Sequence, residues 1–138
     1  MSVLLDTSFV VALAFTDDKD STRAAELFVE IVEGAHGTAF LTDFVVDEAL
    51  TLAWVRSRRS RVVEDLAHLV LAPDPADRPG RLVFVGERAF HEAARLHRRH
   101  HAALSFTDCT HLAVMAERGL TKIATFESGF EGFADVLA

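Results

Sequence analysis

Four acidic residues that are far apart in the sequence each lie next to a predicted strand. Asp6 ends the first apolar run of the chain, and Glu127 follows the last one. Glu48 lies one turn into the helix predicted after the second strand, and Asp108 lies in the first turn of the helix that leads to the last strand. In an open parallel sheet, functional groups gather at the carboxyl ends of the strands. We therefore predict that these four side chains meet at one edge of a sheet.

Carboxylates that cluster in this way predict a metal site. Their mutual repulsion raises their pKa values when the site is empty, and a hard divalent cation relieves it. Oxygen ligands favour Mg²⁺ or Mn²⁺ over Zn²⁺, and the chain has neither a His-Glu-x-x-His motif nor a second thiol beside Cys109. A water activated by such an ion can attack phosphorus in line. The pattern therefore predicts metal-assisted hydrolysis of a phosphodiester, with all four acids as catalytic residues and metal ligands.

Each acid also has a purely structural interpretation. Asp6 could cap the following helix, Glu127 could be a solvated loop residue, and Asp108 fits the Ser-x-x-acid capping box that starts at Ser105. Glu48 is harder to explain in this way, because its neighbours three and four positions away are mostly apolar. An unpaired carboxylate buried on such a face would cost several kcal/mol, so we expect Glu48 to face a cation.

Short apolar runs alternate with helical patterns along the chain. The predicted strands cover residues 2–5, 38–42, 82–85 and 122–126. The predicted helices cover residues 9–15, 21–33, 43–58, 61–71, 86–101 and 105–118, and the tail is expected to be irregular or helical. Strands that alternate with helices predict a parallel sheet covered on both faces. The expected fold is a three-layer α/β/α sandwich with a central parallel sheet, in a single domain over residues 1–138.

The composition is that of a globular domain with a buried core. Hydrophobic residues make up 50% of the 138 residues, and only three residues are proline. The longest apolar run, Phe9 to Phe15, falls short of the roughly 18 residues that a membrane span needs. The N-terminal segment has no basic region and no cleavage site of a secretory signal, and the lone Cys109 fits a reducing compartment. We expect a cytoplasmic protein with no membrane partner.

The net charge of −7 argues against nucleic-acid binding by bulk electrostatics alone. Two local clusters of cations offset it: one is Arg56, Arg58, Arg59 and Arg61, and the other is Arg95, Arg98 and Arg99 with His97, His100 and His101. Arginine suits phosphate oxygens, but cations at a helix C-terminus also complement the helix dipole, so both interpretations stay open. His111, one turn beyond Asp108, either orients a water or a ligand carboxylate or is a packed or capping residue.

Four segments, taken in order, resemble the motifs of PIN domains, and among them those of the small toxin ribonucleases called VapC. They are VLLDTSFVVALAF with Asp6, DFVVDEALTLAW with Glu48, SFTDCTHLAVMAERG with Ser105 and Asp108, and KIATFESGF with Thr125 and Glu127. The resemblance implies a Mg²⁺- or Mn²⁺-dependent endoribonuclease that acts on RNA as the toxin of a type II toxin–antitoxin pair. It also implies a cognate antitoxin protein and a homodimer. The fourth acid of the family is most often aspartate, so Glu127 is a departure, although its extra methylene still lets it reach a metal.

Two other protein classes also begin with a strand and an aspartate, but they fit this sequence less well, and one function of a different class remains open. A phosphatase of the aspartyl-phosphate type needs a second aspartate where this chain has Ser8, and a receiver domain needs paired acids that are missing. A different class stays open: a catalytically weak or inactive PIN-fold module that binds RNA or another protein. Glu127 in place of aspartate favours this module, whereas the intact first three acids favour the enzyme.

Overall fold

A computed structural model describes residues 1–138 and contains one five-stranded sheet. Its strands are β1 (Ser2–Leu5), β2 (Thr38–Thr42), β3 (Arg81–Val83), β4 (Lys122–Ala124) and β5 (Asp135–Leu137). Their order across the sheet is β3-β2-β1-β4-β5, and every neighbouring pair is parallel. The carboxyl ends of all five strands therefore lie at the same edge, with β1 in the middle.

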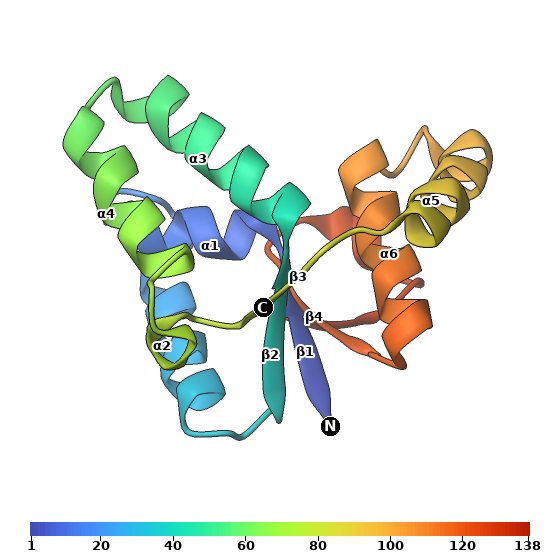
Figure 1. Cartoon of the computed structure of the whole chain (residues 1–138), viewed down its shortest axis with the longest axis horizontal. Helices are drawn as coiled ribbons and strands as arrows, with labels where there is room; N and C mark the ends of the chain where they lie inside the picture. Colours follow the sequence, from blue (N-terminus) through green and yellow to red (C-terminus); the bar gives the residue numbers. More distant parts are fainter.

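Helices cover both faces of the sheet (Figure 1). They are α1 (Thr7–Ala14), α2 (Ser21–Val32), α3 (Asp43–Ser57), α4 (Ser60–Val70), α5 (Glu87–His100) and α6 (Phe106–Arg118), with the 3-10 turns η1 (Pro75–Asp77) and η2 (Ser128–Phe130). The first four helices lie on one face, and α5 and α6 lie on the other, which confirms the predicted three-layer sandwich. None of the six helices combines the length and the apolar character needed to cross a lipid bilayer.

The central strand β1 is buried on both faces. Val3 and Leu5 belong to the core that packs against α1 to α4, whereas Leu4 belongs to a smaller core with Met115 and Ile123. This alternation is what a strand between two helical layers requires, because successive side chains point to opposite faces. The burial of β1 fixes the position of its carboxyl end, and that end carries the first acid.

The C-terminal tail forms a strand that the sequence pattern does not predict. The prediction of an irregular or helical tail is wrong, because β5 pairs in parallel with β4 and the backbone N–H of Thr125 donates to the carbonyl of Leu137. Gly132, with a φ of 87°, turns the chain back after η2 in a conformation that favours glycine. Three residues are too few for alternation to reveal a strand, so only the open edge of β4 decides this conformation.

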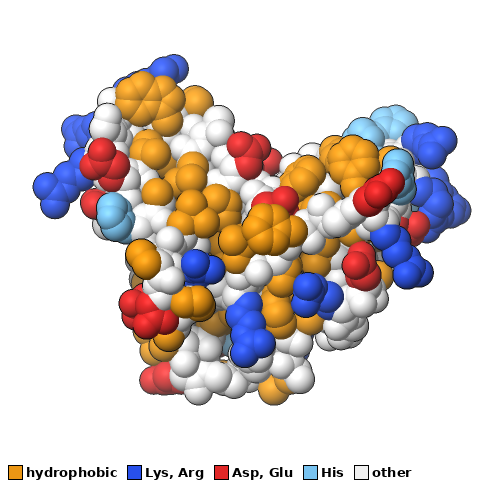
Figure 2. Space-filling model, in the orientation of Figure 1, with side chains coloured by type: hydrophobic (Ala, Val, Ile, Leu, Met, Phe, Trp, Pro, Cys, Tyr) orange, Lys and Arg blue, Asp and Glu red, His pale blue; other side chains and the backbone are white.

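The two helical layers form arms that diverge beyond the carboxyl edge of the sheet. The α3–α4 hairpin makes one arm, and α5 with the start of α6 makes the other (Figure 1). Figure 2 shows a hollow between the arms on this face of the molecule, with many hydrophobic side chains on its surface. The arms therefore flank the edge at which the predicted functional residues lie.

Candidate active site

Asp6 lies between the end of β1 and the start of α1. Its backbone N–H donates to the carbonyl of Ala124 at 3.0 Å, which ties it to the neighbouring strand. Its Oδ2 accepts hydrogen bonds from the hydroxyls of Ser8 at 3.0 Å and Thr125 at 2.7 Å. The side chain makes no capping hydrogen bond to α1, so the capping interpretation is wrong. Because only 2% of Asp6 is exposed, the two hydroxyls replace the water that the carboxylate has lost.

His111 is fully buried on α6 and contacts the same carboxylate. Its Nδ1 lies 3.3 Å from Oδ1 of Asp6, and its ring stacks on Phe130 with 6.1 Å between centroids. Burial acts to raise the pKa of Asp6, but His111, the Thr125 hydroxyl and the Thr7 backbone amide outweigh burial and hold that pKa below its usual value. His111 is therefore a packed residue that also contacts a carboxylate of the predicted site.

Asp108 combines two of the roles considered for it. Its Oδ2 accepts from the backbone N–H of Ser105 at 2.9 Å, and the Ser105 hydroxyl accepts from the backbone N–H of Asp108 at 3.0 Å, which completes the capping box. The same side chain is buried beside Asp6 and His111, and one potential ligand atom from each of these three residues lies within 4.8 Å of the others. The cap holds the carboxylate in place, so capping and ligand binding are compatible.

Glu127 is the most solvent-exposed of the four acids. Partial burial and the negative charges of Asp6, Asp108 and Glu48 raise the pKa of Glu127 from 4.5 to about 7, against a smaller opposing effect of His111. A carboxylate is shifted this way when nearby carboxylates disfavour its charged form. The four acids therefore lie close enough to repel one another, with Asp6 and Asp108 in the interior and Glu48 and Glu127 nearer the surface.

Glu48 lies in the wall of an open cleft. Leu52 and Arg56, four and eight residues further along α3, line the same cleft, which has a volume of about 310 Å³ and also includes Glu127. The side chain of Glu48 is partly exposed, so the expectation that it lies on a buried apolar face is wrong. The apolar neighbours of Glu48 do not bury it, because α3 packs on several sides while the stripe that contains Glu48 faces the cleft.

The contacts of two hydroxyl residues of the site, Ser8 and Thr125, were not predicted from the sequence. Ser8 is not among the predicted site residues, but its hydroxyl donates to Asp6 and accepts from the backbone N–H of Phe126 at 3.0 Å. Thr125 Oγ1 accepts from the backbone N–H of Glu127 at 3.1 Å, in addition to its bond to Asp6. Thr125 and Asp6 are 119 residues apart in the sequence, so no local spacing could reveal this network.

The predicted cation clusters differ in their relation to the cleft. Arg56 lines it, whereas Arg58, Arg59 and Arg61 are exposed around the turn between α3 and α4. The second cluster ends α5, where His97 packs against Phe106 and His100 packs against Phe133. Figure 2 shows basic side chains at the outer ends of both arms. Only one cation of the two predicted clusters therefore lies in the wall of the acidic cleft.

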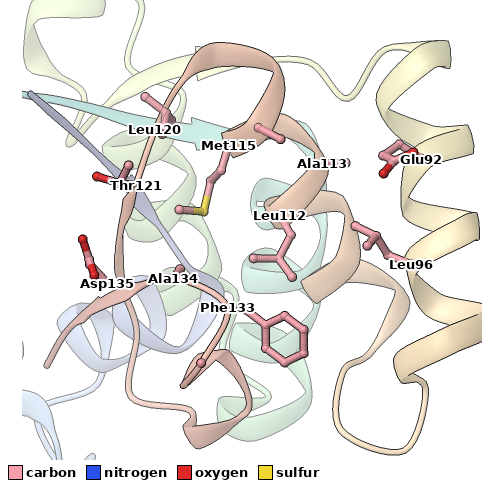
Figure 3. Close-up of a pocket in the computed structure, with 12 residues that line it drawn as sticks. Glu92, Leu96, Leu112, Ala113, Met115, Leu120, Thr121, Phe133, Ala134 and Asp135 are labelled. Carbon is pink, nitrogen blue, oxygen red and sulfur yellow. The ribbon is translucent and has the colours of Figure 1, made fainter.

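A larger pocket lies away from the acids. It has a volume of about 740 Å³ and lies between α5, α6 and the C-terminal segment, where Leu112, Met115 and Phe133 form its apolar lining (Figure 3). Glu92 and Asp135 lie at its margins, but none of the four predicted acids lines it. Its size alone does not make it the reactive site, because the titratable groups that perturb one another lie elsewhere.

The donor atoms fit a hard divalent cation. Asp6 and Asp108 offer buried carboxylate oxygens with His111 beside them, and Glu48 and Glu127 offer further oxygens at the cleft. No lysine or arginine forms an ion pair with any of the four acids. The protein itself therefore pairs none of these acids with a lysine or arginine, and partial burial together with the charges of Asp6, Asp108 and Glu48 raises the pKa of Glu127. The residues present could therefore hold a metal ion.

Comparisons with solved structures reveal proteins of the same architecture. The VapC20 toxin of Mycobacterium tuberculosis, described as cleaving the sarcin-ricin loop, is 23% identical, with 94% of this chain and 93% of that chain covered and a TM-score of 0.79. FitAcB of Neisseria gonorrhoeae is 18% identical, with 99% and 96% covered and a TM-score of 0.68. VapBC2 of Rickettsia felis, bound to a promoter DNA fragment, is 10% identical, with 99% and 98% covered and a TM-score of 0.69. At these identities, the likeness shows a shared fold.

Sequence comparison assigns the family. A search of curated proteins found no match. The family model of the PIN domain, however, matches residues 3–136, which span every strand and helix that positions the four acids. This chain belongs to the PIN domain family.

Proposed function

We propose that the chain is a Mg²⁺- or Mn²⁺-dependent endoribonuclease and the toxin of a toxin–antitoxin pair. The observation that carries this proposal is the group of Asp6, Asp108 and His111, whose potential ligand atoms lie within 4.8 Å of one another. Glu48 and Glu127 add negative charge at the adjoining cleft. The PIN family assignment and the fold shared with VapC20, a toxin described as cleaving an RNA loop, support RNA as the substrate.

The proposed ligands are Asp6 and Asp108, with Glu48 and Glu127 completing the oxygen set. When bound, a divalent ion supplies Lewis acidity for phosphodiester hydrolysis. The contribution of the chain is to hold these carboxylates in fixed positions and to leave them without an ion pair to lysine or arginine. In the metal-free chain the pKa of Glu127 is about 7, and a bound cation would favour the charged form of this carboxylate.

The orientation of Asp6 depends on neighbours from three elements. Ser8 of α1 and Thr125, directly after β4, donate to one carboxylate oxygen, and His111 of α6 lies beside the other. Preorganised ligands of this kind keep a metal site in its working geometry, so their partners matter nearly as much as the ligands. We assign positioning roles to Ser8, Thr125 and His111.

Exposed hydrophobic residues support protein partners in addition to RNA. Trp54 and Val55 lie exposed on the α3–α4 arm, and Phe84 and Phe90 lie exposed after β3 and on α5. Exposed apolar side chains are typical of protein interfaces when they lie together, and Figure 2 shows hydrophobic side chains in the hollow between the arms. We propose the cognate antitoxin and a second copy of this chain as the partners; several of the similar structures are toxin–antitoxin complexes.

The test is RNA cleavage by the purified chain and by two matched variants. Asp108→Asn keeps an oxygen that can complete the capping box but removes the carboxylate charge, so we expect cleavage in Mg²⁺ or Mn²⁺ to fall at least 100-fold, which is about 3 kcal/mol of transition-state stabilisation. Asp47→Asn is the control, because Asp47 is exposed on α3 beside Glu48 and does not line the cleft. Equal cleavage by Asp108→Asn and the parent chain would contradict the proposal.

A non-catalytic PIN-fold module remains the second candidate. The observation that favours it is Glu127, because a longer acid stands at a position where the family most often has aspartate. RNA or antitoxin binding in Mn²⁺ without cleavage, across a panel of structured and single-stranded RNAs, would favour the module over the enzyme.

A further inference from the structure

The cleft that carries Glu48 and Glu127 also contains two cations. Lys19 and Arg56 are among the residues that line it, together with Asp18 and Asp20. Lys19 comes from the turn between α1 and α2, and Arg56 comes from the last turn of α3. Two segments that are far apart in the sequence therefore each bring a positive charge to one side of an acidic cleft.

Arg56 is held in a fixed orientation. Its guanidinium donates to Oδ2 of Asp18 at 3.1 Å and lies over the ring of Phe15, 4.4 Å from the ring centroid. The hydrogen bond to Asp18 uses one of the five N–H donors of the guanidinium, and the side chain remains 38% exposed. A fork that is already oriented loses little freedom when it binds a phosphate.

Lys19 is available to a ligand. It is exposed and forms no ion pair, although the carboxylates of Asp18 and Asp20 adjoin it in the sequence. The chain has only two lysines, and the other, Lys122, begins β4 at the opposite edge of the sheet. An unpaired ammonium group at the rim of an acidic cleft is suited to attract a polyanion that must enter the cleft.

The spacing along α3 separates these cations from the reactive centre. Glu48 and Arg56 are eight residues apart on one stripe of the helix, which corresponds to about 12 Å along its axis. A phosphate that contacts Arg56 is therefore a different one from the phosphate attacked at the carboxylates. A contact of this kind contributes to substrate binding and not to the chemical step.

We propose that Lys19 and Arg56 form a subsite for the RNA backbone, which holds phosphates beside the scissile one. This inference rests on the proposed ribonuclease function and deepens it. The subsite gives a chain of net charge −7 a local contact for RNA, since two cations line the wall of the cleft that carries the acids.

The experiment measures equilibrium binding of a fluorescein-labelled 20-nucleotide single-stranded RNA of mixed sequence by fluorescence anisotropy at several salt concentrations. Every protein carries Asp108→Asn so that cleavage does not interfere. Lys19→Ala and Arg56→Gln are compared with Lys122→Ala and Arg81→Ala, which remove equal charge from the amino ends of β4 and β3. Arg56→Lys keeps the charge, so it separates a lost phosphate contact from a disturbed turn.

Each phosphate contact with a single strand contributes about 0.7 to the slope of log affinity against log salt. We therefore expect Lys19→Ala and Arg56→Gln each to flatten the slope by about 0.7 and to weaken binding about fourfold at 0.15 M salt, while both together weaken it roughly 14-fold. The two control variants and Arg56→Lys keep the slope of the parent. When Lys19→Ala and Arg56→Gln are made in the chain without Asp108→Asn, the weaker binding should appear as a higher KM with little change in kcat.

The outcomes distinguish this inference from the proposed function. If the chain cleaves RNA while Lys19→Ala and Arg56→Gln match their controls in slope and KM, the subsite is wrong and the ribonuclease stands. If the chain binds RNA with the expected slopes but never cleaves it, the subsite stands and the catalytic proposal fails. If the chain neither binds nor cleaves RNA, both fail.

Discussion

The charged form of Glu127 should destabilise the metal-free protein, because partial burial and three neighbouring carboxylates disfavour it, and replacing Glu127 with glutamine should relieve that cost. The folded chain holds the Glu127 proton up to a pH of about 7, whereas an unfolded chain releases it near 4.5. Between these values the folded state binds more protons than the unfolded state, so the free energy of unfolding falls as pH rises through this window. The pKa of Asp6 is lowered, so the titration of Asp6 affects stability only at more acidic pH, outside the window in which Glu127 titrates.

The magnitude follows from the shift and the exposure. A pKa change from 4.5 to about 7 corresponds to about 3 kcal/mol at most. Because the side chain is exposed and solvent screens such repulsion, we expect roughly 1 kcal/mol, or about 4 °C in melting temperature. As the pH rises from 5 to 8 in EDTA, the free energy of unfolding of the parent chain should fall by this amount relative to that of Glu127→Gln.

Urea denaturation at pH 5, 6, 7 and 8 with EDTA measures this difference, with Glu131→Gln as the matched control in the same exposed segment. Addition of Mn²⁺ should stabilise the parent chain more than Glu127→Gln and so shrink or reverse the difference at pH 8. Parallel pH profiles of the parent and Glu127→Gln in EDTA would refute the reasoning, because partial burial and the neighbouring carboxylates would then not disfavour the charged form of Glu127 in the folded state.

Two further substitutions separate structure from chemistry at this site. Ser105→Ala removes the capping hydroxyl and should lower stability by about 1 kcal/mol in thermal melts while cleavage persists; loss of cleavage with unchanged stability would contradict the view that Ser105 only positions Asp108. Thr125→Val removes the hydroxyl that donates to Asp6 and should lower both stability, by about 1–3 kcal/mol, and Mn²⁺ affinity measured by calorimetry. Unaltered Mn²⁺ affinity in Thr125→Val would show that this hydroxyl does not position a ligand.

The sequence by itself determined the layered fold and the approximate positions of the acids. Apolar runs and helical periods are local patterns, and the rule that parallel strands end at a common edge brings Asp6 and Glu127 together without coordinates. The same local logic identified the Ser105–Asp108 capping box, which the structure contains. The elements and the capping box follow from the sequence because each depends on residues within a few positions of one another, and the meeting of Asp6 and Glu127 follows from the general rule for parallel strands.

The tertiary structure decided what depends on distant partners. β5 is a strand because β4 offers an open edge, and Ser8 binds Asp6 and Phe126 because β1 and β4 lie side by side. Glu48 faces a cleft because α1 and the segment after β4 leave that stripe of α3 uncovered. Hydrogen bonds and burial between segments more than a hundred residues apart are set by how the layers pack, and no local pattern records that packing.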